Sequence, residues 1–558
     1  MTTEAQVATL IRSDIAGGIM QIINGEVIYS PSDITSWVKC QWGYVRKLDS
    51  KLGKGNIVPP ETDAMMRYSA RQGTRHERYF LKTLQDHYGA ENVFIISDED
   101  LPKDLPRSEK LTILDARTAD ALKDQWPVVF QASFFDGKYT GFADFLELVE
   151  IDGVLAYQVL DTKLALSDKL HVYDLQLASY ARHLKRLGIP VHETAKLVHG
   201  NLEETEYFLP DIYSRLDLNL ERLNKVEAER RADLLPIAWL SDSYKVCGGC
   251  ASCTEQKDLD PGDLLHVAGL GPAKRNVMVA AGINRMPELA QLGPAAILDI
   301  TPRTLQKLTT QAQRQWRAIE TNDPQISVEN PTAISALPPE NEGDLYFDFE
   351  TDPIFYVEGS DRLGIAYLYG LYSKIPLDFK AFRKSEDGLF QYLWADSRDD
   401  EENMLFLFMM NLMDHLRDYP NAHIYHYSPF EITTLKQLVF QEHKFTMELQ
   451  DIIGLGKFVD LKSTVTSAIS HGLAGYSIKQ LEPLYMGKEL RTGTKNATAS
   501  ITRYDDYHRT LNGDVLELGE TADEIREDVL QYNRYDCYSM LRLRNWLDSL
   551  KKEYGDSR

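Results

Sequence analysis

The cysteines of this chain are unevenly spaced, in a pattern typical of metal ligands. Cys40 stands alone near the N-terminus, whereas Cys247, Cys250 and Cys253 follow one another far downstream as C-G-G-C-A-S-C. Four thiolates can complete one metal centre, either a structural zinc site or an iron–sulfur cluster. We therefore expect a metal to hold together the two ends of a domain, and we expect the fifth cysteine, Cys537, to be a packed thiol.

Two aspartates and a lysine between these cysteines could hydrolyse a phosphodiester. Asp144 ends the segment G-F-A-D, and Asp161 and Lys163 follow in L-D-T-K about one hairpin later, so adjacent strands would bring the two carboxylates together. Mg²⁺ or Mn²⁺ suits such ligands and would neutralise charge on the phosphorane, while the lysine would orient or activate the attacking water. Three polar residues on predicted helices flank this set: His76, Gln176 and Tyr180.

This ordered set resembles the RecB-like branch of the PD-(D/E)xK nucleases. That family has, in order, a helical His, an Asp in G-x-x-D, a D-x-K and a Q-x-x-x-Y, and the matching residues here are His76, Asp144, Asp161 with Lys163, and Gln176 with Tyr180. The resemblance implies that the histidine and both aspartates bind the metal, that the lysine acts on the water, and that the last two residues belong to the catalytic set. As an alternative, the last two are packed polar residues.

The resemblance extends to the cysteines. Iron–sulfur members of this branch carry one N-terminal and three C-terminal cysteines that bind a 4Fe-4S cluster, which implies the same role for Cys40, Cys247, Cys250 and Cys253. The final C-x-x-C-x-x-C spacing is tighter than in those relatives, which leaves the cluster type open. Zn²⁺ stays the alternative because thiolates suit it too.

A second acidic set lies in the C-terminal part. Asp348 and Glu350 stand at i and i+2 in L-Y-F-D-F-E, so both carboxylates would lie on one strand face and could bridge two metal ions ~4 Å apart. This D-x-E resembles the first motif of DnaQ-like exonucleases of the RNase H-like fold, and Y-S-P-F-E and Y-N-R-Y-D resemble the second and third. The resemblance, which includes YprB-type exonuclease domains and the DEDDy subclass, implies Mg²⁺ or Mn²⁺ ligands and a water-positioning tyrosine: Asp348, Glu350, Glu431, Asp536 and Tyr532.

The second motif departs from that family, with Tyr in place of Asn and Glu in place of Asp. Asp460 in V-D-L-K is a competing carboxylate for this position, with a capping or surface role as the alternative.

The stretch H-V-A-G-L-G-P-A-K-R between the two acidic sets resembles a helix-hairpin-helix. Its glycines, Gly269 and Gly271, would expose backbone N–H groups to a phosphate oxygen, and Lys274 and Arg275 would add positive charge. Residues 264–317 hold seven Lys and Arg against two acidic residues, so this basic segment is a candidate DNA contact. A helical pair that only packs beside the nuclease is the alternative.

The composition excludes several classes of protein. The chain of 558 residues has a net charge of −23, which argues against a surface coated with phosphate-binding residues, and five cysteines are too few for a disulfide scaffold. No apolar run approaches the ~20 residues that span a bilayer, so we expect no membrane partner. The start of the chain does not resemble a secretory signal, and we expect a cytoplasmic location.

Hydrophobic patterns predict elements that position both acidic sets. A capping box of Ser30 and Asp33, with Pro31 at the first helical position, predicts a helix that carries Cys40, and a further helix is expected over 66–90. Strands are expected over 127–135, 141–150 and 154–162 and a helix over 169–187, and a long terminal helix is expected from near Ile525.

These elements predict an α/β multi-domain protein. Its expected parts are a RecB-like PD-(D/E)xK nuclease core with the cysteine clasp over 1–260, a small helical helix-hairpin-helix domain over 261–320, a proline-rich linker over 321–342 and an RNase H-like α/β domain over 343–558.

The predicted function is that of a metal-dependent nuclease, specifically a DNA exonuclease with two phosphodiester-cleaving sites. Nucleic acid, DNA in the first place, is the expected partner, and DNA repair and phage defence are compatible settings. The alternatives are a non-catalytic nucleic-acid-binding scaffold and an RNA 3′–5′ exonuclease that acts through the C-terminal domain.

Overall fold

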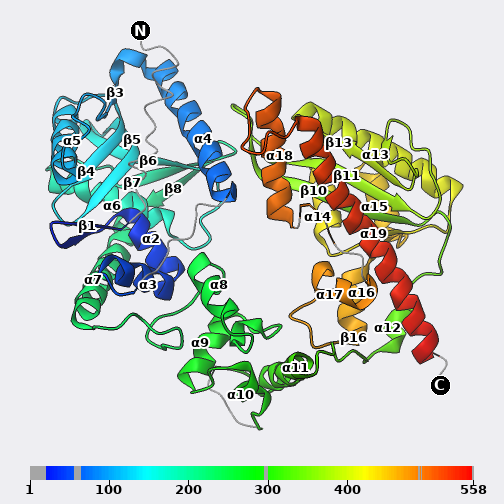
Figure 1. Ribbon diagram of the computed structural model, residues 1–558. Coiled ribbons are helices and arrows are strands. Elements are labelled where there is room, and N and C mark those ends of the chain that lie inside the picture. The colour runs from blue at the N-terminus through cyan, green and yellow to red at the C-terminus, as the bar shows by residue number, and fades with distance from the viewer. Residues whose placement is uncertain are drawn as a thin grey trace. The chain divides into compact units, whose positions relative to one another are not determined.

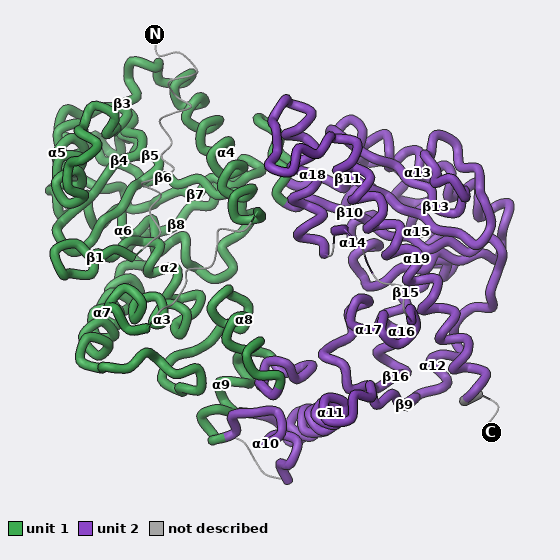
Figure 2. Tube along the Cα trace, in the orientation of Figure 1, with its two compact units in different colours: residues 1–261, 271–282, 354–363 green, residues 262–270, 283–353, 364–558 purple. Residues whose placement is uncertain are grey.

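The computed structural model describes residues 20–55, 64–293, 299–487, 491, 493–494 and 496–555 (Figure 1). Residues 1–19, on which the cytoplasmic expectation rests, lie outside the described residues. The chain forms two compact units, which Figure 2 colours separately. Unit 1 comprises residues 1–261, 271–282 and 354–363, and unit 2 comprises residues 262–270, 283–353 and 364–558. Within the described helices, none has the length and apolar character needed to cross a membrane.

Unit 1 is built on a mixed six-stranded sheet with the order β3-β4-β5-β6-β7-β8 (Figure 1). Its strands are β3 (Val93–Ile95), β4 (Val128–Phe135), β5 (Thr140–Ile151), β6 (Val154–Lys163), β7 (Thr194–His199) and β8 (Glu204–Phe208). Strands β4, β5 and β6 pair antiparallel, and β6 then pairs parallel with β7. The helix α6 (Tyr173–Arg186) makes this parallel crossover.

Helices cover both faces of this sheet because its strands bury side chains alternately on each side. Phe130 of β4 and Phe145 of β5 pack with Leu81 of α4 (Ala64–Tyr88) in one core. The neighbouring Val129 and Leu146 belong to the larger core on the opposite face. That core also receives side chains from five helices: α2 (Pro31–Lys39), α3 (Gln41–Lys51), α5 (Arg107–Lys123), α6 and α7 (Pro210–Ala232).

The predicted N-terminal capping box is present at the start of α2. The Ser30 backbone N–H and hydroxyl donate to Asp33 Oδ2 at 3.0 and 2.8 Å. Cys40 lies directly after α2 and is also the N-cap of α3, so it sits in the sharp bend between the two helices rather than within one.

Unit 2 contains a second six-stranded sheet with the order β12-β13-β11-β10-β14-β15 (Figure 1). Its strands are β10 (Leu345–Tyr356), β11 (Leu363–Ser373), β12 (Arg383–Lys384), β13 (Phe390–Trp394), β14 (Ile424–His426) and β15 (Phe458–Asp460). β13 pairs antiparallel with β11 and β12, whereas β14 pairs parallel with both β10 and β15.

Side chains alternate between the two faces of β10, and each face packs against a different helix. Phe347 stacks on Phe408 of α13 (Arg398–Asp418), with 4.8 Å between the ring centroids. Tyr346 belongs to the core that holds Met540 and Leu543 of the terminal helix α19 (Ala522–Gly555). Since Asp348 and Glu350 share the register of Tyr346, both carboxylates are directed toward α19.

Residues 321–342, expected to be a linker, are instead integrated into unit 2. Strand β9 (Ser327–Val328) pairs antiparallel with β16 (Ile469–Ser470). Pro331 begins α12 (Pro331–Ser335), and the buried Ile334 and Leu337 pack in the core that includes α19. The composition of this segment is typical of a linker. A proline at the start of its helix and two buried apolar residues nevertheless make it a packed part of unit 2.

The expected small domain over 261–320 is not a compact unit of its own. Residues 271–282, with α9 (Pro272–Ala280), belong to unit 1, and the flanking stretches belong to unit 2. The latter contain the 3₁₀ helix Leu264–His266, α10 (Met286–Ala290) and α11 (Pro302–Thr321). Gln315 of α11 fixes the first of these stretches, because it accepts from Ala268 N at 2.7 Å and donates to His266 O at 2.8 Å.

Candidate nuclease sites and a four-cysteine centre

Three carboxylates converge in unit 2 between β10 and α19. Asp348 and Glu350 come from alternate positions of β10, and Asp536 comes from α19. One oxygen of each lies within 4.8 Å of the others, so the three residues could hold a metal ion. The predicted motifs at the start and the end of this domain therefore meet in space, and this group forms the acidic centre.

Burial and mutual repulsion give the acidic centre a strong tendency to take up cations. Burial, with the nearby charges of Asp536 and Glu350, raises the pKa of Asp348 well above its ordinary value. Burial and Asp536 raise the pKa of Glu350 to about 8. Carboxylates that repel one another in a low dielectric take up protons or bind a divalent cation, and Mg²⁺ and Mn²⁺ fit this all-oxygen ligand set.

Asn533 is a residue of this site that the sequence analysis missed. It is fully buried on α19, and its Nδ2 donates to Asp348 Oδ2 at 2.9 Å and to Glu350 Oε1 at 3.5 Å. The available signal was its position three residues before Asp536, which places both on one helix face. Asn533 fixes the spacing of the two strand carboxylates.

Tyr532 lies at the edge of the acidic centre with a cation beside it. Its hydroxyl accepts a hydrogen bond from Nζ of Lys479, in α17 (Ile478–Tyr485), at 2.6 Å. Burial, with repulsion from Asp536, raises the pKa of Tyr532, and burial lowers the pKa of Lys479. Because the lysine occupies an oxygen lone pair, the phenolic proton stays available for donation to a phosphate or a water.

A pocket opens beside Tyr532. It has a volume of about 320 Å³ and an aromatic and polar lining: Tyr372, Arg491, Thr494, Gln531, Tyr532, Arg534, Tyr535 and Tyr538. The Arg491 guanidinium donates to Asp536 and to Glu482, so it links the pocket to the acidic centre.

Glu431, the expected fourth ligand, lies near the acidic centre but outside the three-carboxylate group. Its Oε2 lies 3.4 Å from His426 Nδ1. Its charge still contributes to the raised pKa of Asp348. The competing carboxylate, Asp460, caps α16 (Leu461–Ala468) by accepting from Lys462 N at 2.9 Å, which corresponds to its alternative role.

The predicted set in unit 1 gathers around the β5–β6 pair. The register pairs Phe145 with Leu160, which brings the adjacent Asp144 and Asp161 side by side. Asp161 is fully buried and forms an ion pair with Lys163, and Asp144 Oδ2 accepts from Thr162 N at 3.1 Å. Asp161 Oδ1 has no hydrogen-bond partner among the described residues, so this buried oxygen is available to a cation.

The charges of this set are strongly coupled. Burial and the charge of Asp144 raise the pKa of Asp161 well above its ordinary value. Burial would lower the pKa of Lys163, but the carboxylates of Asp161 and Asp144 outweigh it, and the net shift is upward. Lys163 is therefore protonated in this arrangement, which suits it to orient a water rather than to deprotonate one.

Glu77 is the residue of this set that the sequence analysis missed. Burial and the charge of Asp144 raise its pKa to about 8, and its carboxylate accepts a hydrogen bond from Gln131. The signal was its position directly after the predicted His76. In the part of the chain that the structure describes, no three ligand atoms of this set lie within 4.8 Å of one another.

His76 has one ring nitrogen engaged and one free of a hydrogen bond. Its Nε2 lies 3.2 Å from Val198 O, whereas the buried Nδ1 has no hydrogen-bond partner among the described residues. Burial lowers the pKa of His76, so the ring is a neutral imidazole, the form that binds metals.

The predicted helical pair of this set packs over the G-x-x-D segment. Gln176 Nε2 donates to the Tyr180 hydroxyl at 2.9 Å, and Tyr180 is buried. A methyl group at Gly141 would lie 3.0 Å from Tyr180 Cε1, so the glycine of G-x-x-D leaves room for the tyrosine ring.

The four predicted cysteines lie together in unit 1. The measured Sγ–Sγ distances are 3.6 Å for Cys40 and Cys253, 3.8 Å for Cys250 and Cys40, and 4.0 Å for Cys247 and Cys253, and all four sulfurs lie within 4.8 Å of one another. Cys40 is the N-cap of α3, and Cys250 is the N-cap of α8 (Ala251–Asp258). Both helix N-termini therefore direct partial positive charge toward the thiolates.

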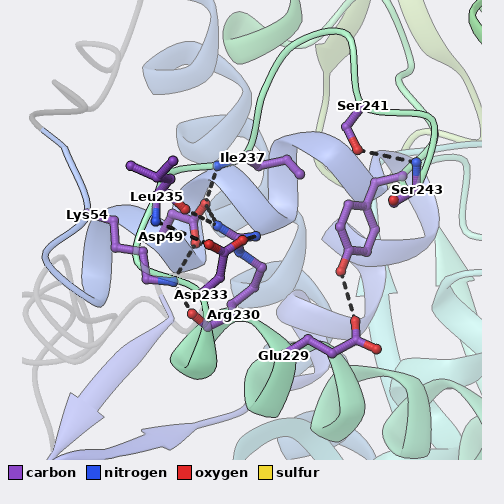
Figure 3. A network of polar contacts seen from close by, with 10 residues as sticks. Asp49, Lys54, Glu229, Arg230, Asp233, Leu235, Ile237, Ser241 and Ser243 are labelled. Carbon is purple, nitrogen blue, oxygen red and sulfur yellow. Dashed lines mark hydrogen bonds and ion pairs between the residues drawn. The ribbon is translucent and has the colours of Figure 1, made fainter.

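A buried polar network anchors the segment that leads from α7 to Cys247 (Figure 3). Arg230 Nε donates to Asp49 Oδ1 at 2.8 Å, and its Nη2 donates to Asp49 Oδ2 at 2.9 Å. Asp49 Oδ2 also accepts from Ile237 N at 2.7 Å, and Lys54 Nζ lies 3.7 Å from Asp49 Oδ1. This network ties α3, which Cys40 caps, to the chain that approaches the other cysteines.

The residues predicted to contact DNA differ in their exposure to solvent. Gly271 is the N-cap of α9, and Gly269 has a φ of 85°, which favours glycine. Lys274 is partly exposed, but Arg275 is buried, with its Nη2 donating to Trp239 O at 2.8 Å and its guanidinium 4.3 Å from the Trp239 ring. The DNA-contact role predicted for Arg275 is therefore wrong, because its charge is used in packing.

The comparison with protein families concerns the unit that holds the acidic centre. Residues 345–548 match the family model described as the RNase_H superfamily. This part of the chain is an RNase H-like domain. No curated protein matches the chain. Membership of its C-terminal part in this superfamily indicates a nuclease-type hydrolase of nucleic acid, and such nucleases usually use Mg²⁺ or Mn²⁺.

Proposed function

We propose that this protein is a metal-dependent exonuclease, and that the acidic centre of its RNase H-like domain is one catalytic site. The observation that carries this proposal is the convergence of Asp348, Glu350 and Asp536 within 4.8 Å in a domain of nuclease type. Mg²⁺ or Mn²⁺ bound there would neutralise the phosphate and activate a water. Glu431, whose charge already acts on Asp348, would complete the ligand set after its side chain moves toward the centre.

The residues around the acidic centre support hydrolysis at a chain end. Tyr532, held by Lys479, would position the attacking water or a phosphate oxygen by donating a hydrogen bond from its phenol. The adjacent pocket of about 320 Å³ has the size and the tyrosine lining to stack one terminal nucleoside.

A second catalytic site in unit 1, of the RecB-like PD-(D/E)xK type, is supported by Asp144, Asp161 and Lys163. Asp161 Oδ1 and His76 Nδ1, which have no hydrogen-bond partner within the described residues, are the atoms that would bind a metal there. Lys163 would orient the water, Gln176 and Tyr180 would support the strand carrying Asp144, and Glu77 would add a further carboxylate. Lys274 with the backbone at Gly271, the N-cap of α9, would contact phosphates as in a helix-hairpin-helix.

The test is cleavage of matched single-stranded and double-stranded DNA and of RNA by three variants: Asp348→Asn, Asp161→Asn and the double variant. We expect each single variant to lose one activity by at least about 100-fold, because a metal ligand is removed, and the double variant to lose both. Retained binding of the oligonucleotides would show that chemistry is affected rather than folding.

The outcomes separate the alternatives. Wild-type cleavage by the double variant would refute both assignments. Binding that is unaffected by a chelator, without any turnover in Mg²⁺ or Mn²⁺, would favour the non-catalytic scaffold. Degradation of RNA in strong preference to DNA, abolished by Asp348→Asn, would favour the RNA exonuclease.

A further inference from the structure

The spacing of the four cysteine sulfurs discriminates between the two metal centres that the sequence allowed. A zinc ion sits about 2.3 Å from each of four tetrahedral thiolates, which places the sulfurs about 3.8 Å from one another. Three of the six Sγ–Sγ distances, 3.6, 3.8 and 4.0 Å, lie close to this value, and the other three do not exceed 4.8 Å. A single ion at the middle of the group would contact all four sulfurs.

A four-iron cluster does not fit this arrangement. In such a cluster each cysteine binds a different iron, so the four sulfurs surround a core of eight atoms rather than one ion. All four Sγ atoms here lie within 4.8 Å of one another, which leaves no volume between them for that core. We infer that the four-cysteine centre holds a single tetrahedral metal ion, zinc, and that the iron–sulfur cluster implied by the resemblance is absent from this chain.

Contacts around the centre maintain its small size. Gly43 N donates to Cys40 Sγ at 3.3 Å, and Cys250 N donates to Cys247 Sγ at 3.3 Å, as expected for charged thiolates. Arg46 of α3 donates to Ser252 O at 3.2 Å and forms an ion pair with Glu255 of α8. The two Arg46 contacts join α3 to α8 independently of the metal and so limit how far Cys40 can lie from the downstream cysteines.

The function of such a centre is structural. Four protein ligands leave a zinc ion without an open position for substrate or water, and zinc undergoes no redox change. The ion would join Cys40 to residues more than 200 positions downstream, and its binding free energy would stabilise the folded chain. This inference does not rest on the proposed nuclease activity, and its test uses no activity measurement.

The test is the metal content of the full-length protein, purified without oxygen from cells supplied with both iron and zinc. We expect about one zinc per chain, with little iron or acid-labile sulfide and no visible absorption. Replacement by Co²⁺ should give the d–d bands of a tetrahedral thiolate complex. The variant Cys250→Ser should lose the metal, whereas Cys537→Ser, in unit 2, should keep it. Iron and sulfide in stoichiometric amounts, or a folded protein without bound metal, would overturn the inference.

A pair of glycine variants tests the compactness of the site. A methyl group at Gly43 would lie 3.2 Å from Cys40 Sγ and 3.3 Å from Cys250 Sγ, whereas a methyl group at Gly249 would meet no atom within 4 Å. We expect Gly43→Ala to release zinc to a chelator at least about tenfold faster than wild type, and Gly249→Ala to behave as wild type. Equal release from both variants would mean that the sulfurs are not confined as inferred.

Discussion

Gly370 provides a sharp test of how the acidic centre is positioned. It lies in β11, and a methyl group added to it would stand 1.7 Å from Asn533 Oδ1 and 2.8 Å from Asn533 Cγ. These separations are far below any van der Waals contact, so Gly370→Ala must displace the Asn533 side chain. Displacement breaks the hydrogen bond of 2.9 Å to Asp348, and the strand carboxylates lose the group that fixes their spacing.

The expected cost follows from two terms. A hydrogen bond to a charged partner contributes about 1.5 to 3 kcal/mol, and overpacking of a core costs about 1 to 3 kcal/mol, so the free energy of unfolding should fall by about 2.5 to 6 kcal/mol. Cleavage assigned to this site should fall about 100-fold if the ligands shift by ~1 Å. The assays are denaturant unfolding and exonuclease turnover.

Two further variants isolate the cause. Gly454→Ala adds the same methyl at an exposed position with no atom within 4 Å, and should be neutral. In an Asn533→Ala background the two closest atoms are absent and only Phe390 Cε2, at 3.1 Å, stays near the added methyl, so Gly370→Ala should cost at least about 1 kcal/mol less than in wild type. Strictly additive costs, or a wild-type stability for Gly370→Ala alone, would refute the steric argument.

Two other predictions follow from buried charges. Because the pKa of Glu350 is about 8 in the folded chain and its ordinary value is 4.5, the metal-free protein should lose stability as pH rises from about 4.5 to 8. The variant Glu350→Gln should reduce the dependence of the unfolding free energy on pH by up to about 1.4 kcal/mol per pH unit. The measurement is denaturant unfolding at several pH values in the presence of a chelator. An unchanged pH dependence would contradict the raised pKa of Glu350. Asp49→Ala removes the buried carboxylate that pairs with Arg230 and leaves the guanidinium only the half-exposed Asp233, so it should cost about 3 kcal/mol in urea unfolding, with faster zinc loss. An unaltered unfolding midpoint would disprove that role.

Local residue patterns determined much of the fold. The capping box at Ser30 and the alternating strands of the first sheet depend on hydrogen bonds and side-chain directions within a few residues, and the structure has them near the predicted positions. The same holds for the D-x-E on one strand face, because alternation alone places Asp348 and Glu350 together. The RNase H-like nature of residues 345–548 was also visible in the order of three short motifs.

Other properties depend on which side chains meet across the fold, and no local pattern encodes them. Arg275 resembled a phosphate contact, but the position of Trp239 made it a buried packing residue. The proline-rich segment before residue 343 packs because α19 offers it an apolar surface. Asn533 and Glu77 belong to the candidate sites because the folded strands place carboxylates beside them.

The four cysteines show most clearly which properties depend on the sequence and which depend on the tertiary structure. Their spacing in the sequence predicted a metal centre, because thiolates at such intervals suit few other roles, and the structure brings the four sulfurs together. Only the tertiary structure decided its size, since the distance between Cys40 and the downstream cysteines is set by how α3 and α8 pack. Ligand identity is thus a property of the sequence, whereas the volume that ligands enclose is a property of the packed helices that carry them.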